Sequence, residues 1–326
     1  MSIARVRGPG HPDVACDLVA ASIVEEYLKR DQAAKLSIRV AGGRGALFVT
    51  GDVLSSADFD VAALVRRVLV ANGVQANQEP FIALEPMTPS WAPQFGSRDV
   101  CSVIGYATSE MSDRFPKAMS TARTIAQTLE EKRTSDPEWF WLGSDFEVVV
   151  DGDSVTIRVE QIGEALASLR EKINALIVSH FTPQTLRINL AGEETAAGLG
   201  SRIGSSGSSS SIDGYGSFLP CGASGCGRHF LYPLNIGSVL ARQVARELVE
   251  QQRGKAVLVQ ATWLPLESKP HAIRIRNERG EDLSSAVDGE RFNLACPAAA
   301  LLDPSLVSAL ARAPFDRTVD ALWEKS

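Results

Sequence analysis

Acidic residues and a histidine stand beside glycine at several points of this 326-residue sequence, first in GPGHPDVACD at residues 8–17. The glycine-rich start runs into a helical pattern, with His11 and Asp13 in its first turn. Unpaired N–H groups at a helix N-terminus favour anions, so His11 could contact phosphate and Asp13 could hold Mg²⁺. The same residues also suit an ordinary helix start, with proline at the first position and an acidic first turn.

Three more acidic residues lie at the ends of strand-like runs. Asp52 follows the run ALFVTG, Asp99 precedes the apolar run CSVIGYA, and Asp145 precedes FEVVV. Each position suits a side chain that contacts a ligand, and the aromatic residues before Asp145 could cradle a base or a ribose. Each also has a plain alternative, which is an exposed strand end, the N-cap of the next helix or a place in the core.

Two adjacent carboxylates, Glu193 and Glu194, lead into a glycine loop that contains Arg202. A magnesium–polyphosphate site needs this combination, because acids hold the cation, glycines let backbone N–H groups approach phosphate and arginine bonds phosphoryl oxygens in pairs. The loop opens a segment, residues 198–228, with nine glycines and nine serines, which also fits a flexible linker. We expect its SSGSSSS centre to make few contacts and its basic flanks to close over a polyanion as a lid.

Helices and paired strands must position these residues. Apolar residues at three- and four-residue steps predict helices, alternation between turn signals predicts strands, and a polar, proline-rich stretch at 74–99 predicts a loop. The predicted helices cover residues 11–31, 59–72, 113–132, 162–178, 235–252 and 303–311. The predicted strands are a pair at 36–40 and 46–53, a hairpin at 146–161, a pair at 256–264 and 271–277, and single strands at 101–107 and 186–190. This order of about three ββα units indicates an α+β fold.

Composition limits the classes of function. The chain carries 33 Lys and Arg against 39 Asp and Glu, a net charge of −6, and has no long basic run, so we expect no nucleic-acid partner. No apolar run reaches the about 18 residues of a membrane helix, so we expect no membrane partner. Five cysteines without a Cys-x-x-Cys pair fit free thiols in a reducing cytoplasm. The alternative is a redox or metal role for Cys221 and Cys226.

The order of these motifs resembles that of the S-adenosylmethionine synthetase family. The chain has GHPD with a second aspartate four residues on, then a glycine–aspartate turn at Asp52 before SSADFDVAALVRR, where bacterial members read GHPDK and GEITTSA. Asp99 stands six residues before GYATSE, and Asp145 precedes a hairpin, as in the family. GEET and GLGSRIG within 192–204 are similar to the archaeal branch. The resemblance is collinear over about residues 5–250.

This resemblance implies three α+β subdomains of ββα type in a pseudo-threefold arrangement, and a homodimer with active sites at its interface. The expected subdomains are residues 12–98, residues 1–11 with 99–192, and residues 193–326. The implied activity is that of a transferase that joins ATP and L-methionine. The sulfur attacks C5′, tripolyphosphate leaves and is hydrolysed to phosphate and pyrophosphate, and Mg²⁺ and K⁺ assist.

The resemblance also implies a role for each candidate residue. Those expected at the phosphates are His11, Arg202 and Arg228. Those expected at Mg²⁺ are Asp13, Glu193 and Glu194. Those expected at the organic parts of the substrates are Asp52 near methionine, Asp99 near methionine or nucleotide, and Asp145 at the adenosine.

The sequence departs from the family pattern at several charged positions. The lysine after HPD is Val14, the lysine of the bacterial PDAK motif is Glu147, and the lysine of a later loop is Arg228. The glutamate that binds K⁺ is Arg39, whose guanidinium could replace the ion. Fewer cations would weaken the stabilisation of a charged leaving group, since one preorganised contact is worth about 3 kcal/mol. Two alternatives therefore stand beside the synthetase: a catalytically silent paralogue that binds nucleotide or S-adenosylmethionine as a regulatory partner, and a same-fold enzyme with another substrate.

Overall fold

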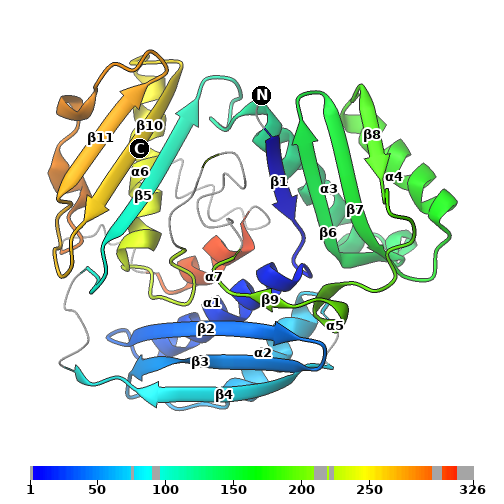
Figure 1. Cartoon of the computed structure of the whole chain (residues 1–326), viewed down its shortest axis with the longest axis horizontal. Helices are drawn as coiled ribbons and strands as arrows, with labels where there is room; N and C mark the ends of the chain where they lie inside the picture. The colour runs from blue at the N-terminus through cyan, green and yellow to red at the C-terminus, as the bar shows by residue number, and fades with distance from the viewer. Residues whose placement is uncertain are drawn as a thin grey trace.

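The computed structural model describes residues 3–74, 77–89, 96–208, 219, 224–295 and 303–313. Three sheets, each with its own helices, surround the middle of the molecule (Figure 1). The strands are β1 (Ile3–Arg7), β2 (Lys35–Gly43), β3 (Ala46–Leu54), β4 (Glu79–Pro86), β5 (Cys101–Thr108), β6 (Leu142–Asp151), β7 (Ser154–Gln161), β8 (Thr185–Ile188), β9 (Gly204–Ser205), β10 (Ala256–Trp263) and β11 (Ala272–Asn277). The helices are α1 (Pro12–Arg30), α2 (Val61–Ala71), α3 (Lys117–Ser135), α4 (Leu166–His180), α5 (Gly198–Ser201), α6 (Pro233–Glu250) and α7 (Ser305–Arg312).

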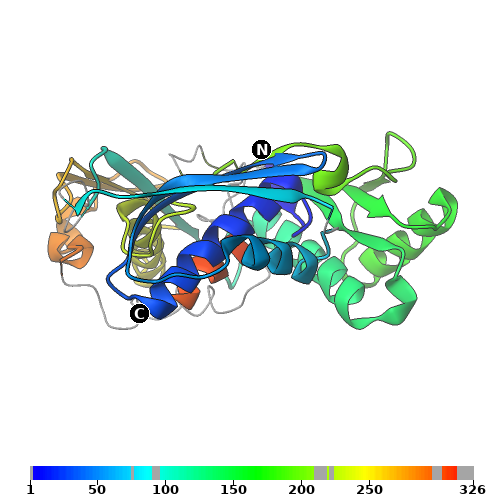
Figure 2. The same ribbon diagram turned by 90° about the horizontal axis from the view of Figure 1, so that it is seen from below.

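The first sheet has the strand order β4-β3-β2-β9 and lies at the bottom of Figure 1. Strands β2 and β3 form an antiparallel hairpin, and β4 runs parallel to β3. Leu36, Ile38 and Val40 alternate along β2 toward a buried face, which α1 and α2 cover, as the turned view in Figure 2 shows. The opposite face of the sheet carries Arg39 and Asp52, and none of the described helices covers it.

The second sheet has the order β1-β6-β7-β8, and helices α3 and α4 pack with it. The β6–β7 register shifts between Leu142 and Phe146, so Asp145 lies in an irregular stretch of the ladder. Such irregularities turn a side chain away from the regular alternation of a strand. The edge strand of this sheet is β1, which pairs with β6. It leads directly into the N-terminus of α1 and so brings this edge of the sheet to the first helix.

The third sheet has the order β11-β10-β5, with α6 packed across it. The packing is close at Gly105, where an added Cβ would lie 2.1 Å from the carbonyl carbon of Ala241. Only glycine fits there without displacing the helix backbone. Strand β5 pairs with β10 in this sheet, and its buried face packs on α6. The predicted division assigns the residues of β5 to the second subdomain.

The architecture confirms the predicted α+β fold with three sheet-and-helix units. Each predicted helix and hairpin is present within a few residues of its expected bounds. The loop prediction for residues 74–99 is wrong at β4, because EPFIALEP forms an edge strand, where proline is tolerated. No helix within the described ranges is long and apolar enough to cross a bilayer.

Candidate active site

The N-terminus of α1 carries His11 as its N-cap. Its Nδ1 accepts a hydrogen bond from the backbone N–H of Asp13 at 3.3 Å, and the residue is only 8% exposed. Burial, together with the positive charge of Arg7, lowers the pKa of His11 to about 3. The imidazole is therefore neutral at pH 7, and because Nδ1 accepts, its proton lies on Nε2.

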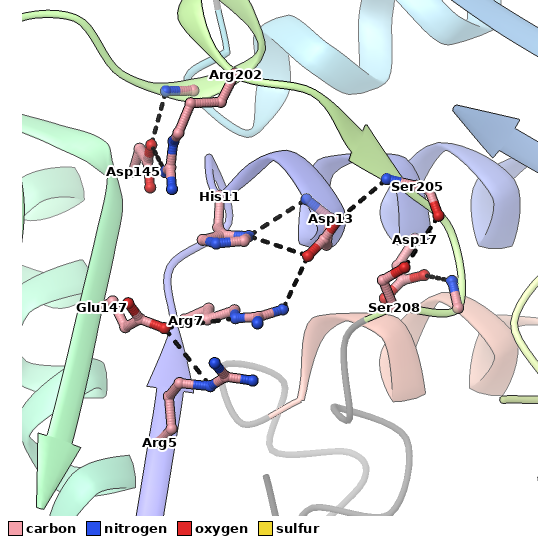
Figure 3. A network of polar contacts seen from close by, with 12 residues as sticks. Arg5, Arg7, His11, Asp13, Asp17, Asp145, Glu147, Arg202, Ser205 and Ser208 are labelled. Atoms are coloured by element: carbon pink, nitrogen blue, oxygen red, sulfur yellow. Dashed lines mark hydrogen bonds and ion pairs between the residues drawn. The ribbon is translucent and has the colours of Figure 1, made fainter. Parts of the chain in front are cut away.

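Both carboxylate oxygens of Asp13 are already bonded. Arg7 donates Nη1–H to Oδ2 at 3.0 Å, and the backbone N–H of Ser205 donates to Oδ1 at 3.1 Å. Arg7 also lies 3.6 Å from Glu147, which in turn lies 3.5 Å from Arg5 (Figure 3). The aspartate thus joins the end of β1 to β9, an element almost two hundred residues further along the chain.

Asp145 is fully buried beside the same helix end. It accepts hydrogen bonds from Arg158 Nη2 at 2.6 Å, from the backbone N–H of Gly198 at 2.6 Å, and from Arg202. Burial alone would raise the pKa of this carboxyl, but the charge and hydrogen bond of Arg158, with the bonds from Arg202 and Gly198, hold it below its usual value. Asp145 is therefore an ionised anchor between two guanidinium groups.

A separate cavity of about 510 Å³ opens beside the outer face of the first sheet. It brings together Asp52 from β3, Asp99 before β5 and Arg228 at the end of the Gly/Ser-rich segment. The guanidinium of Arg228 lies 5.1 Å from the ring centroid of Tyr232, and burial lowers the pKa of Arg228. The remaining lining residues are Lys35, Leu36, Ser37, Pro86, Met87, Thr88, Ser97, Arg98 and His229.

Known proteins with similar sequence and structure fall in one family. The sequence model of the S-adenosylmethionine synthetase N-terminal domain matches residues 4–86. S-adenosylmethionine synthase of Mycoplasma capricolum is 25% identical over 300 residues, covering 82% of this chain and 77% of that protein. The Aquifex aeolicus synthase is 25% identical over 308 residues, covering 85% and 82%. An unusual S-adenosylmethionine synthetase from Campylobacter jejuni has the same fold, with a TM-score of 0.79 at 19% identity over 100% of this chain and 97% of that one.

These matches support a divergent member of the S-adenosylmethionine synthetase family. Proteins of this family generally use Mg²⁺ and K⁺, so the donor groups here can be tested against those ions. Among the described residues no three His, Cys, Asp or Glu side chains group as a metal site. Asp13 is paired with the guanidinium of Arg7 at 3.0 Å, and this positive charge repels a divalent cation at the same carboxylate. The acidic residues as arranged do not fit a Mg²⁺ ion at Asp13.

Glu193 and Glu194 make no described contact with Asp13. Glu193 is exposed, and Glu194 is held through its backbone, whose carbonyl accepts from the N–H of Gln161 at 2.9 Å. Arg39 donates Nη1–H to the carbonyl oxygen of Cys226 at 2.5 Å. A carbonyl oxygen is also a ligand for K⁺, and the replacement of that ion by Arg39 stays a prediction.

The predicted arginine cradle is divided between two places. Arg202 binds Asp145, whereas Arg228 lines the cavity and Arg39 binds the Cys226 carbonyl. The sequence-based prediction placed Arg202 and Arg228 at the phosphates and Arg39 in place of K⁺, and in the structure the three residues have different partners. Asp145 forms an ion pair with Arg202, and the negative charges of Asp99 and Asp52 act on Arg228.

Several residues of the site were not singled out from the sequence. Tyr232 shares a hydrogen bond with Ser97 at 2.9 Å, between hydroxyl oxygens, and so joins the loop before β5 to the start of α6. Lys35 lines the cavity, and burial lowers its pKa. A signal for Lys35 was present, because it alternates with Ser37 and Arg39 on the same face of β2. No local signal distinguishes Arg7, whose partner is six residues away around a turn.

The start of the Gly/Ser-rich segment is fixed to the first sheet and to α1. The N–H of Ser206 donates to the Val40 carbonyl at 2.7 Å, and the Ser206 hydroxyl accepts from the Val40 N–H at 2.9 Å. The N–H of Gly207 donates to Asp17 at 2.6 Å. The expectation of few contacts is therefore wrong for residues 205–208, because two acidic residues of α1 and the edge of β2 pair with their backbone. Residues 209–218, the rest of the expected lid, lie outside the described part.

The cysteines show no shared site among the described residues. Cys16, Cys101 and Cys226 are buried free thiols, and the Cys226 thiol donates to the Asp17 carbonyl at 3.6 Å. Burial raises the pKa of the Cys226 thiol well above its usual value, which keeps it protonated. Cys221, the other half of the proposed redox or metal pair, lies outside the described residues.

Proposed function

We propose that the chain is an S-adenosylmethionine synthetase-like transferase, which joins ATP and L-methionine and releases phosphate and pyrophosphate. The observation that supports this proposal most is the cavity beside the first sheet. It gathers Asp52, Asp99 and Arg228, which the motifs had marked as substrate-binding residues and which lie far apart in the sequence. A cavity that unites them is what a shared substrate would need.

The charges around the cavity suit a zwitterionic amino acid. A carboxylate could pair with Arg228, whose planar guanidinium matches its two oxygens, and an ammonium group could approach Asp52 or Asp99. In the proposed reaction a lone pair of the methionine sulfur attacks C5′ of ATP. The C5′–O bond breaks, and the electron pair leaves with tripolyphosphate, whose hydrolysis then gives phosphate and pyrophosphate.

The catalytically silent paralogue is the second candidate. The specific observation in its favour is that Asp13 and Asp145 are both neutralised by arginines of the same chain. An acid already paired in this way is a weaker ligand for a metal–phosphate complex. Under this alternative the chain would bind nucleotide or S-adenosylmethionine without turnover.

We further propose that the chain forms a homodimer through the outer face of the first sheet. Phe48 and Phe81 stack on neighbouring strands with ring centroids 5.1 Å apart, and each is about half exposed, at 52% and 50%. An exposed aromatic pair on a helix-free sheet face favours a protein partner. Asp52 and Arg39 lie on the same face, so a second copy would stand next to the cavity.

The activity is tested by incubating the protein with ATP, L-methionine, Mg²⁺ and K⁺ and detecting S-adenosylmethionine and phosphate products by mass spectrometry. We expect product formation that falls at least tenfold in Asp99→Asn and in Asp52→Asn. Glu85→Gln is the matched control, because Glu85 is the register partner of Asp52 on β4 but does not line the cavity. Binding of S-adenosylmethionine without any product would instead support the silent paralogue.

A further inference from the structure

The contacts around Asp13 place a guanidinium where the family would use a divalent ion. Arg7 donates to Oδ2 of Asp13, and Ser205 donates to Oδ1, so the charge of this carboxylate is already paired with a guanidinium, which repels a second cation. Arg7 is held there by its backbone, because β1 pairs with β6 up to the Arg7–Glu147 register position. The next residue continues the contact, with the Gly8 N–H donating to the Phe146 carbonyl at 2.7 Å.

The register of these two strands shows where the positive charge comes from. The resemblance expects the lysine of the bacterial PDAK motif at the position of Glu147, so β6 carries an anion where a cation is expected. Its partner across the ladder is Arg7, whose Nε lies 3.6 Å from the Glu147 carboxylate. Directly opposed residues of an antiparallel pair interact in this way. The cation next to Asp13 is therefore supplied by β1, the neighbouring strand.

A second feature of the same place points to an anionic ligand. His11 is only 8% exposed, and because its Nδ1 accepts the hydrogen bond from the Asp13 N–H, its proton lies on Nε2. Within the described part of the chain this N–H has no acceptor. Guanidinium groups lie near it, since Arg7 is bonded to Asp13 and Arg202 is bonded to Asp145 (Figure 3). An N–H donor of a largely buried residue at the N-terminus of a 19-residue helix, with guanidinium groups nearby, suits a phosphate oxygen.

We propose that Arg7 is a built-in cation at Asp13, and that the chain binds phosphate groups of its nucleotide beside His11 without a divalent ion there. The proposal rests on the proposed function only in taking the ligand to be a nucleotide. It makes Arg7 a specificity-determining residue, because it sets which form of the polyphosphate, metal-free or metal-bound, the site accepts.

The test measures binding of inorganic tripolyphosphate by calorimetry, once in EDTA and once with Mg²⁺. We expect the unaltered protein to bind in EDTA and to gain nothing from Mg²⁺. Arg7→Ala should bind at least tenfold more weakly in EDTA and recover with Mg²⁺, because the freed Asp13 oxygen and a phosphate oxygen can then share the ion. The double variant Arg7→Ala/Asp13→Asn should not recover. Arg5→Ala is the matched control, because Arg5 contacts Glu147 but not Asp13, and it should change binding less than threefold.

A second readout follows the metal directly. In the presence of tripolyphosphate, bound Mn²⁺ should be seen by electron paramagnetic resonance for Arg7→Ala and not for the unaltered protein. The proposal is overturned if the unaltered protein needs a divalent ion to bind tripolyphosphate, if it binds none under either condition, or if Arg7→Ala binds normally in EDTA. Since neither assay uses methionine or turnover, metal-free binding by a chain that makes no S-adenosylmethionine would refute the proposed activity alone.

Discussion

Asp145 offers the sharpest test of how the site is held together. Its carboxylate is fully buried and accepts three hydrogen bonds, from Arg158 on one oxygen and from Gly198 and Arg202 on the other. Asp145→Asn keeps the shape of the side chain but has one acceptor oxygen and an amide group in place of the second. If the oxygen stays with Gly198 and Arg202, the amide N–H faces the donor of Arg158.

The expected loss follows from these contacts. A hydrogen bond to a charged group contributes about 1.5–3 kcal/mol. The two bonds that remain, from Gly198 and Arg202, then have a neutral amide oxygen as their acceptor in place of a carboxylate. Arg158 and Arg202 are 22% and 39% exposed, so water can solvate part of what the substitution leaves unpaired. We therefore expect Asp145→Asn to lower the free energy of unfolding by about 2–4 kcal/mol.

Urea unfolding followed by circular dichroism measures this change. Asp153→Asn is the control, because Asp153 is about half exposed and lies 3.7 Å from Lys117, so its removal should have little effect. A loss for Asp145→Asn no larger than that of the control would refute the description of Asp145 as a buried anchor.

The pH dependence of the same variant checks the cause. The folded-state pKa of Asp145 is lowered, so the stabilisation is complete above the unfolded-state pKa of about 4 and is lost as pH falls toward the lower, folded-state value. Asparagine does not titrate. The difference in stability between the two proteins should therefore be constant above about pH 5 and shrink below about pH 4, and a difference that grows on acidification would contradict the assignment.

Two further predictions concern assembly and packing. Phe48→Asp should convert the dimer to a monomer near 35.0 kDa by light scattering, because it puts a charge into the proposed apolar interface, whereas Phe140→Asp, at an exposed turn before β6, should not. Gly105→Ala should lower the unfolding free energy by about 1–3 kcal/mol or more, because its Cβ would overlap the backbone of Ala241. Gly200→Ala, with open space around it, is the control, and equal melting temperatures for the two alanine variants would contradict this packing.

Local patterns were sufficient for most of the fold. The β2–β3 and β6–β7 hairpins were predicted because both strands and their glycine-containing turns lie within one short stretch of sequence. The parallel strand β4 was missed, since its partner β3 is separated from it by a helix and its two prolines indicate a loop. Strand β5 was recognised as a buried strand, but its apolar pattern does not say which sheet it joins.

The site divides in the same way. Glycine and acidic motifs marked Asp13 and Asp145, and the structure places both beside His11. Their bonding partners were beyond reach, because Ser205 and Arg202 come from a part of the chain nearly two hundred and about sixty residues away, respectively. A motif states which groups are present, whereas the charge that a ligand meets depends on which of them are already paired.

Arg7 shows why comparison of positions one at a time gives an incomplete account of this site. Counted along the sequence, Glu147 is a lost lysine, and the loss argues against phosphate chemistry. Counted across the β1–β6 ladder, the same position faces Arg7, and the guanidinium stands between Glu147 and Asp13. The positive charge at this place lies on β1, opposite the anion of β6, and an oxygen of Asp13 is bonded to the guanidinium of Arg7. Under our proposal, Arg7 attracts the phosphate groups in place of a divalent ion. A sequence that departs from the family at Glu147 is therefore compatible with phosphate binding.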